Sequence, residues 1–124
     1  MSAVLELRAL SAGYRGMPVV RSLDLHVDAG EVVALAGANG AGKTTTLLAV
    51  SGLAERLGGD VVVLGRSTKG MRPSAIARLG VAHVPEDRGL FATLTVAENL
   101  RVAGRMSRSE VHRSLEHFPE LERL

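Results

Sequence analysis

The sequence contains no cysteine and no tryptophan, and aromatic residues make up only 2% of its 124 residues. The absence of cysteine excludes disulfides, thiolate nucleophiles and zinc sites built on thiolates. With so few aromatic rings, any core must be built from valine, leucine and alanine, and we expect no stacking surface for single-stranded nucleic acid. The single tyrosine, Tyr14, is therefore of particular interest.

The sequence also lacks a large excess of charge of one sign and a long apolar run. The 15 Lys and Arg residues nearly balance the 13 Asp and Glu residues, and the basic residues are scattered, so we expect no nucleic-acid partner. The longest apolar runs, such as residues 32–36 and 61–64, fall far short of the roughly 20 residues that span a bilayer. The N-terminal residues include Glu6 and no apolar block, which predicts no signal peptide, no membrane insertion and a cytoplasmic location.

The apolar pattern predicts an antiparallel sheet at the N-terminus, followed by a buried strand. Residues 4–10 favour a strand that ends at a turn over residues 11–13. Residues 19–28 alternate between apolar and polar, as in a half-buried strand. Residues 32–36 are apolar without alternation, which is typical of a parallel strand buried on both faces.

The remaining elements are predicted to be short. Residues 60–64 and 81–84 favour further strands, and residues 44–50 favour a helix. Pro73 can open a helix over residues 73–78. Two capping boxes, Thr95 with Glu98 and Ser107 with Glu110, predict helix starts near the C-terminus.

Residues 37–44 match the phosphate-binding pattern G-x-x-x-x-G-K-[ST] in full. Glycines let several backbone N–H groups converge on a polyphosphate, and the helix that begins near Gly42 adds its positive end. Lys43 is expected to reach the β and γ phosphates, Thr44 to present a hydroxyl to Mg²⁺, and Thr45 to donate to the α phosphate. The alternative is a glycine-rich turn with a solvated lysine.

The nine residues GANGAGKTT resemble the Walker A motif of ATP-binding-cassette (ABC) ATPases, because asparagine precedes Gly-Ala-Gly. In that family an aromatic residue just after the first strand stacks on adenine, and Tyr14 in SAGYRG stands at that place; the alternative is an exposed turn tyrosine. The ATP site implied by the resemblance comprises Tyr14, Gly37, Asn39, Gly40, Ala41, Gly42, Lys43, Thr44 and Thr45.

Residues 76–100, IARLGVAHVPEDRGLFATLTVAENL, resemble the Q-loop region and the start of the family's helical subdomain. The segments VPE and LTVAENL are similar to ATPases of branched-chain amino-acid uptake, in which Glu commonly replaces the glutamine, as Glu86 does here. The resemblance implies that Glu86 approaches Mg²⁺ or the attacking water; the alternative is a solvated carboxylate. Phe91 and Leu94 would lie near the groove for a permease helix, or would pack under their own loop.

The resemblance runs from about residue 4 to residue 124 and implies an α/β P-loop NTPase fold of the ABC ATPase type. This fold combines an N-terminal antiparallel sheet, a parallel strand with P-loop and helix, and the start of the helical subdomain. We predict one partial domain over residues 1–124, divided into a nucleotide-binding core portion at 1–85 and the Q-loop region at 86–124. Within these residues we find no signature motif, Walker B aspartate, catalytic glutamate or switch histidine. Glu86 aside, no catalytic residue is expected, nor is hydrolysis by these residues alone.

The resemblance implies an ATP-binding subunit of an ABC importer, for branched-chain amino acids, that uses ATP and Mg²⁺. Its partners would be permease subunits and a second ABC ATPase subunit, and it would lie at the inner face of the cell membrane through the permease. ATPases of urea uptake resemble the same pattern. Two other classes remain open: a non-hydrolytic nucleotide-binding module, and a P-loop kinase whose lid would use Arg88, Arg101 and Arg105. The match over VPE and LTVAENL speaks against the kinase.

Overall fold

The computed structural model describes residues 2–38, 40–85, 90–104, 112–113 and 116–120. The chain divides into two compact units, Met1–His83 and Val84–Leu124. None of the helices in the described part of the chain is long and apolar enough to cross a membrane.

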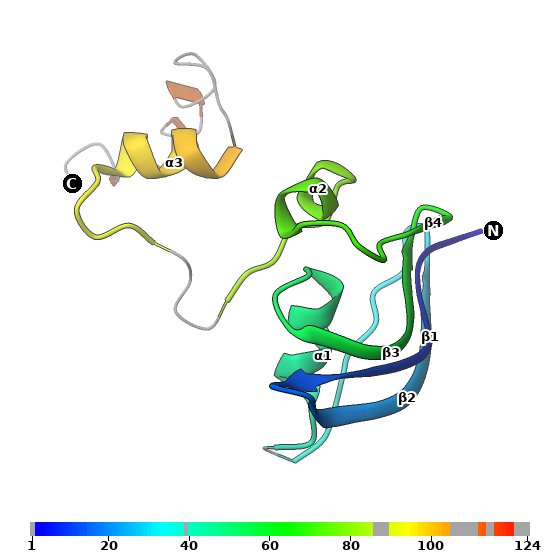
Figure 1. Ribbon diagram of the computed structural model, residues 1–124. Helices are drawn as coiled ribbons and strands as arrows, with labels where there is room; N and C mark the ends of the chain where they lie inside the picture. Colours follow the sequence, from blue (N-terminus) through cyan, green and yellow to red (C-terminus); the bar gives the residue numbers. More distant parts are fainter. Residues whose placement is uncertain (1, 39, 86–89, 105–111, 114–115, 121–124) are drawn as a thin grey trace. The chain divides into compact units, whose positions relative to one another are not determined.

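The first unit is built on one antiparallel sheet (Figure 1). The sheet has the strand order β2-β1-β3-β4, so β1 lies in its middle and pairs with both β2 and β3. This arrangement confirms the predicted N-terminal antiparallel sheet. The strands are β1 (Ala3–Tyr14), β2 (Met17–Asp28), β3 (Glu55–Val63) and β4 (Arg66–Ser67).

The first strand is longer than the sequence predicts. The turn expected at residues 11–13 lies inside β1, because Gly13 pairs with Pro18 on one side and with Glu55 on the other. The chain turns instead at Arg15 and Gly16, whose φ angles are 52° and 75°. Two successive residues with positive φ are typical of the tight turn that matches the twist of a two-stranded hairpin. The turn therefore places Tyr14 at the end of β1.

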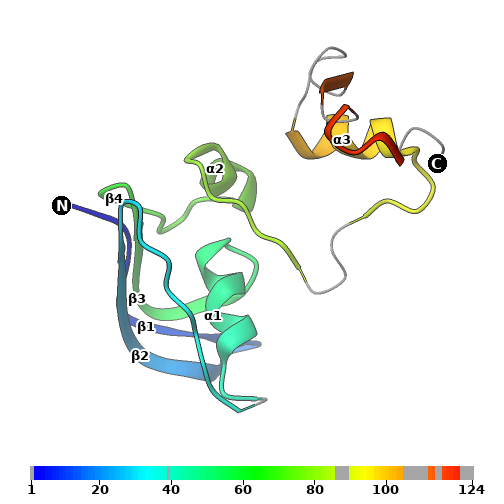
Figure 2. The same ribbon diagram turned by 180° about the vertical axis from the view of Figure 1, so that it is seen from behind.

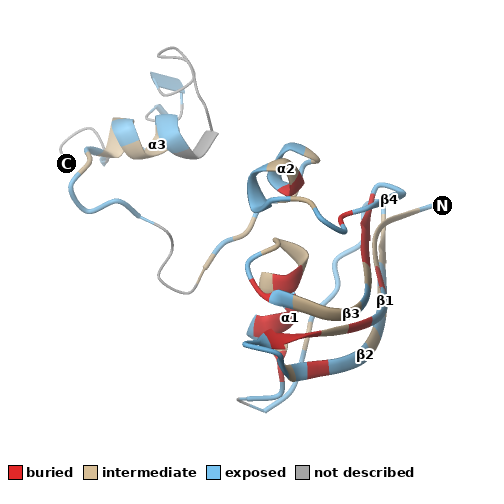
Figure 3. Cartoon of the chain, in the orientation of Figure 1, coloured by how far each residue is buried: buried red, intermediate tan, exposed pale blue. Residues whose placement is uncertain are grey.

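Two helices accompany the sheet and confirm the predicted helices of this unit. α1 (Lys43–Val50) lies against one face of the sheet, as Figures 1 and 2 show from opposite sides. α2 (Pro73–Arg78) buries Ile76, which packs beside Gly52 just after the end of α1. Burial is concentrated on β1, β3 and α1 (Figure 3), and the core consists of Leu7, Leu10, Ala12, Ala49, Ala54, Val61 and Val63.

Two predicted strands are wrong, and a third is longer than predicted. Residues 32–36 are not in a strand, and Val32 is 95% exposed rather than buried on both faces. Residues 81–84 are not in a strand either. A strand needs a neighbouring strand that forms hydrogen bonds with its backbone N–H and C=O groups. No strand in the described part of the chain lies beside residues 32–36. The strand expected at residues 60–64 begins earlier, at Glu55, and ends at Val63.

The second unit contains α3 (Val96–Gly104). The Glu98 N–H donates to Thr95 Oγ1 over 3.1 Å, so Thr95 caps the start of this helix as predicted. The second capping box, Ser107 with Glu110, lies outside the described residues.

Asn99 on α3 holds the loop that precedes the helix. Its Oδ1 accepts from the Phe91 N–H at 2.9 Å, and its Nδ2 donates to the carbonyls of Phe91, Leu94 and Thr95 at 3.1, 3.3 and 2.9 Å. A side-chain amide that offers both a donor and an acceptor can pair with a backbone like another peptide group. One side chain therefore fixes residues 91–95.

We predict that Gly59→Ala destabilises the first unit and that Gly58→Ala does not. Gly59 has a φ of 73°, and a Cβ there would overlap the carbonyl oxygens of Arg8 and Ala9. A Cβ on Gly58 would meet only Ser11, whose nearest atom is 3.7 Å away. Urea unfolding should show a loss of about 2 kcal/mol or more for Gly59→Ala, against a change within about 1 kcal/mol for Gly58→Ala. Equal effects would contradict the close approach of β3 to β1 at Gly59.

We predict that Asn99→Asp loosens residues 91–95, because a carboxylate oxygen would replace the amide donor that faces three carbonyl oxygens. Hydrogen exchange at the Phe91 amide should accelerate about 10-fold. The matched control is Glu98→Gln, because only the backbone N–H of Glu98 takes part in the cap. An unchanged exchange rate in Asn99→Asp would show that the amide does not hold the loop.

Candidate nucleotide-binding site

The glycine-rich segment that precedes α1 is folded into a compact loop. Gly40 and Gly42 have φ angles of 85° and 93°, in the left-handed region that glycine adopts without strain. The Ala41 N–H donates to the Ala38 carbonyl over 3.1 Å and closes a turn inside the loop. This bond therefore brings residues 38 and 41 together within the motif.

Gly42 joins this loop to the sheet. It is buried and directly precedes α1, and a Cβ at this position would lie 2.9 Å from Val20 Cγ2. Val20 is a buried residue of β2. The absence of a side chain thus lets the start of α1 rest directly on the β1–β2 hairpin.

Lys43 reaches across the loop. Its Nζ donates to the carbonyl of Gly37 at the opposite end of the motif. The ammonium therefore lies over the glycine loop, next to the first turn of α1, where unsatisfied backbone N–H groups give the helix a positive end. Glycines without side chains, a helix start and an ammonium group at one place fit the phosphates of a nucleotide.

The three threonines that follow have different environments. Thr46 is buried, and its hydroxyl donates to the Gly42 carbonyl over 2.8 Å, which is a structural role. Thr44 is exposed, so its hydroxyl is open to a ligand such as Mg²⁺. Thr45 is only 6% exposed, and its Oγ1 lies 3.4 Å from the hydroxyl oxygen of Tyr14.

Tyr14 is thus brought to the start of α1 from 31 residues away in sequence. The residue is 44% exposed, so much of its ring remains open to solvent beside the loop. An aromatic ring in this place can stack with any base, because stacking needs only a π face. The structure therefore places Tyr14, Lys43, Thr44 and Thr45 around one region.

Other predicted site residues are not among those that the structure brings together around the glycine loop. Asn39 and Glu86 lie outside the described residues. Among the residues that are described, no group of three or more His, Asp or Glu side chains could hold a metal ion, and the predicted role of Thr44 toward Mg²⁺ stays a prediction. In the second unit Phe91 is 52% exposed and Leu94 is partly buried, and their predicted contact with a permease remains a prediction.

Sequence reasoning missed two contacts that shape these regions. The packing of Gly42 on Val20 joins positions 22 residues apart, and no pattern within either segment signals it. The Asn99 bonds to residues 91–95 have a weak local signal, since an asparagine in a first helical turn often bonds nearby backbone.

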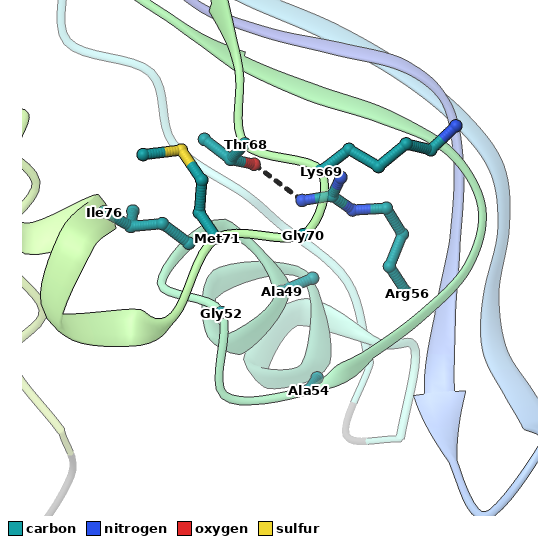
Figure 4. A pocket seen from close by; sticks show the side chains of 9 residues that line it. All are labelled: Ala49, Gly52, Ala54, Arg56, Thr68, Lys69, Gly70, Met71 and Ile76. Atoms are coloured by element: carbon teal, nitrogen blue, oxygen red, sulfur yellow. Dashed lines mark hydrogen bonds between the residues drawn. The ribbon is translucent and has the colours of Figure 1, made fainter.

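A separate hollow of about 290 Å³ lies at the other end of α1 (Figure 4). On its polar side, Arg56 Nη2 donates to Thr68 Oγ1 over 2.6 Å, and Nη1 forms an ion pair of 3.3 Å with Asp60. These bonds engage Nη1 and Nη2 and Asp60 balances the charge, while the buried Nε has no hydrogen-bond partner among the described residues. The hollow is lined by Ala49, Gly52, Ala54, Arg56, Thr68, Lys69, Gly70, Met71 and Ile76.

Comparison with known proteins agrees with the geometry of the loop. The probable branched-chain amino acid transport ATP-binding protein LivF of Archaeoglobus fulgidus is 33% identical over 117 residues, which cover 90% of this chain and 50% of LivF. The Nod factor export ATP-binding protein I of Cupriavidus pinatubonensis is 39% identical and covers 100% of this chain, but 38% of that protein. The chain therefore spans about half or less of the length of these curated relatives.

The fold comparison points the same way. A solved structure of the ATP-binding subunit of an ABC transporter matches with a TM-score of 0.77 at 37% identity, over 97% of this chain and 52% of that chain. The predicted α/β P-loop NTPase fold of the ABC ATPase type is thereby confirmed. A family model described as ABC transporter matches residues 20–123, and the chain belongs to this family of ATP-binding proteins.

Proposed function

We propose that the chain binds ATP with Mg²⁺ on the loop over residues 37–45. The observation that carries this proposal is the position of the Lys43 ammonium over the glycine loop, with the Tyr14 ring beside it at Thr45. Lys43 binds the β and γ phosphates, the exposed Thr44 hydroxyl meets Mg²⁺, and the Tyr14 ring stacks on adenine. The backbone N–H groups of Gly40 and Gly42 would donate to the phosphates, whereas the Ala41 N–H is held by the Ala38 carbonyl and Asn39 lies outside the described residues.

The chain is further proposed to act as an ATP-binding part of an ABC importer for branched-chain amino acids. The similarity to LivF and the segments VPE and LTVAENL support this substrate class. The similarity to a Nod factor exporter supports the ATP-binding role without favouring this substrate, and a urea importer is the alternative. Permease subunits and a second ATP-binding subunit would be its partners, and through the permease it would lie at the inner face of the membrane.

Two residues of the proposed transporter role lie in the segment after residue 85. Glu86, at the position of the family's glutamine, would approach Mg²⁺ or the attacking water and relay the state of the γ phosphate. Phe91 would contact the permease from the loop that Asn99 holds. The exposure of Phe91 and its bonded backbone support this role.

A non-hydrolytic nucleotide-binding module is the second candidate function. Within residues 1–124 no apolar strand pattern ends in the aspartate that would hold Mg²⁺ or the glutamate that would orient water, so these residues taken alone would bind ATP without turnover. The two candidates share ATP binding and differ in turnover.

We predict that Lys43→Ala weakens ATP binding about 30-fold or more, because it removes the charge that faces the phosphates. The control is Lys69→Ala, which removes the chain's other lysine, an exposed residue away from the loop. Mg²⁺ and ATP should raise the melting temperature of the parent and of Lys69→Ala, but not of Lys43→Ala at the same ligand concentration. Equal stabilisation of all three proteins would overturn the proposed site.

We predict that the 124-residue chain binds ATP without releasing phosphate above the rate in buffer. Positioned carboxylates supply much of the catalysis in phosphoryl transfer to water, and their absence leaves the attacking water unoriented. A phosphate-release assay with the Lys43→Ala variant as background measures this. Release that disappears in Lys43→Ala would show that the chain carries catalytic groups and would exclude the non-hydrolytic module.

A further inference from the structure

The contact between Tyr14 and Thr45 connects the end of β1 to the first turn of α1. Tyr14 ends β1, and its place is set by pairing with Met17 and by the Gly16 N–H, which donates to Glu55 Oε2 on β3 over 3.2 Å. Thr45 is buried in the first turn of α1. Their hydroxyl oxygens, 3.4 Å apart, therefore join the sheet to the helix that follows the glycine loop.

The chemistry of the two hydroxyls allows this contact to persist when a nucleotide binds. A threonine hydroxyl has one donor and two acceptor positions, so it can accept from Tyr14 while donating to a phosphate oxygen. The distance of 3.4 Å is longer than the 2.7–2.8 Å typical of such bonds.

From these positions we infer that Thr45 is a positioning residue for the base. Its hydroxyl holds the Tyr14 hydroxyl and so sets the orientation of the ring on which the purine stacks. Within the described part of the chain, Thr45 is the hydrogen-bond partner of the Tyr14 side chain. The inference rests on the proposed ATP site and adds to it a link between recognition of the base and recognition of the phosphates.

A double-mutant cycle tests the link. Tyr14→Phe keeps the ring and removes the hydroxyl, and Thr45→Val keeps the shape of the side chain and removes its hydroxyl. For ATP with Mg²⁺ we expect each single variant to bind about 3- to 10-fold more weakly, and the double variant to bind no more weakly than the weaker single variant. With tripolyphosphate, which has phosphates but no base, we expect the losses of the two variants to be additive.

The chain offers an internal probe for this experiment. It contains one tyrosine and no tryptophan, so its ultraviolet emission reports on Tyr14 alone. Stacking of adenine should quench this emission in the parent and in Thr45→Ser, which retains the hydroxyl, and should quench it less in Thr45→Val. Melting curves of the variants without ligand show whether each one folds.

The outcomes separate the inference from the proposed function. Losses that are additive with ATP, or equal quenching in Thr45→Ser and Thr45→Val, would overturn the positioning role while leaving ATP binding in place. Coupling of the same size with ATP and with tripolyphosphate would also overturn it, because the link would then act on the phosphates. A parent chain that binds no ATP would overturn the proposed function and the inference together.

Discussion

The close packing of Gly42 on Val20 is the contact on which the position of the glycine loop and of the start of α1 depends. Because Gly42 has no side chain, the start of α1 approaches β2 to within van der Waals distance. The same residue has a left-handed φ of 93°, which turns the chain from the loop into the helix. The lack of room for a Cβ and the left-handed backbone conformation both require glycine at position 42. Together they set the orientation of the start of α1.

The Lys43 ammonium is held by a hydrogen bond that does not neutralise its positive charge. Lys43 donates to a neutral backbone carbonyl, and among the ion pairs found in the described residues none involves Lys43. A carboxylate partner would have held the ammonium as well, but it would also have neutralised the charge. A carbonyl acceptor fixes the side chain over the loop and leaves its positive charge available for an anion. Arg56 provides the contrast, because Asp60 balances its charge beside the hollow at the far end of α1.

The apolar segment at residues 32–36 shows the limit of reasoning from periodicity. A continuous apolar run indicates that both faces of the segment are suited to burial. It does not indicate whether other strands lie beside the segment to form the sheet. In the structure these residues form no strand and are mostly exposed, and the sheet of the described residues ends at β2 and β4. In β1 the long-range pairing adds to a strand instead of leaving one out. Residues 11–13 have a composition that favours a turn, but pairing with β2 and β3 keeps them in the strand.

Features that depend on neighbours within a few residues could be predicted from the amino-acid sequence. These are the glycine loop, the helices at residues 43–50 and 73–78, the Thr95 cap and the alternation of β2, all of which follow from local backbone preferences and hydrogen bonds. The contacts of Tyr14 with Thr45 and of Gly42 with Val20 could not be predicted in this way and became visible in the folded chain. Such contacts depend on the register of β1 with its two neighbours and on the packing of α1 against the sheet, and both are set by the whole set of long-range pairings rather than by any one segment.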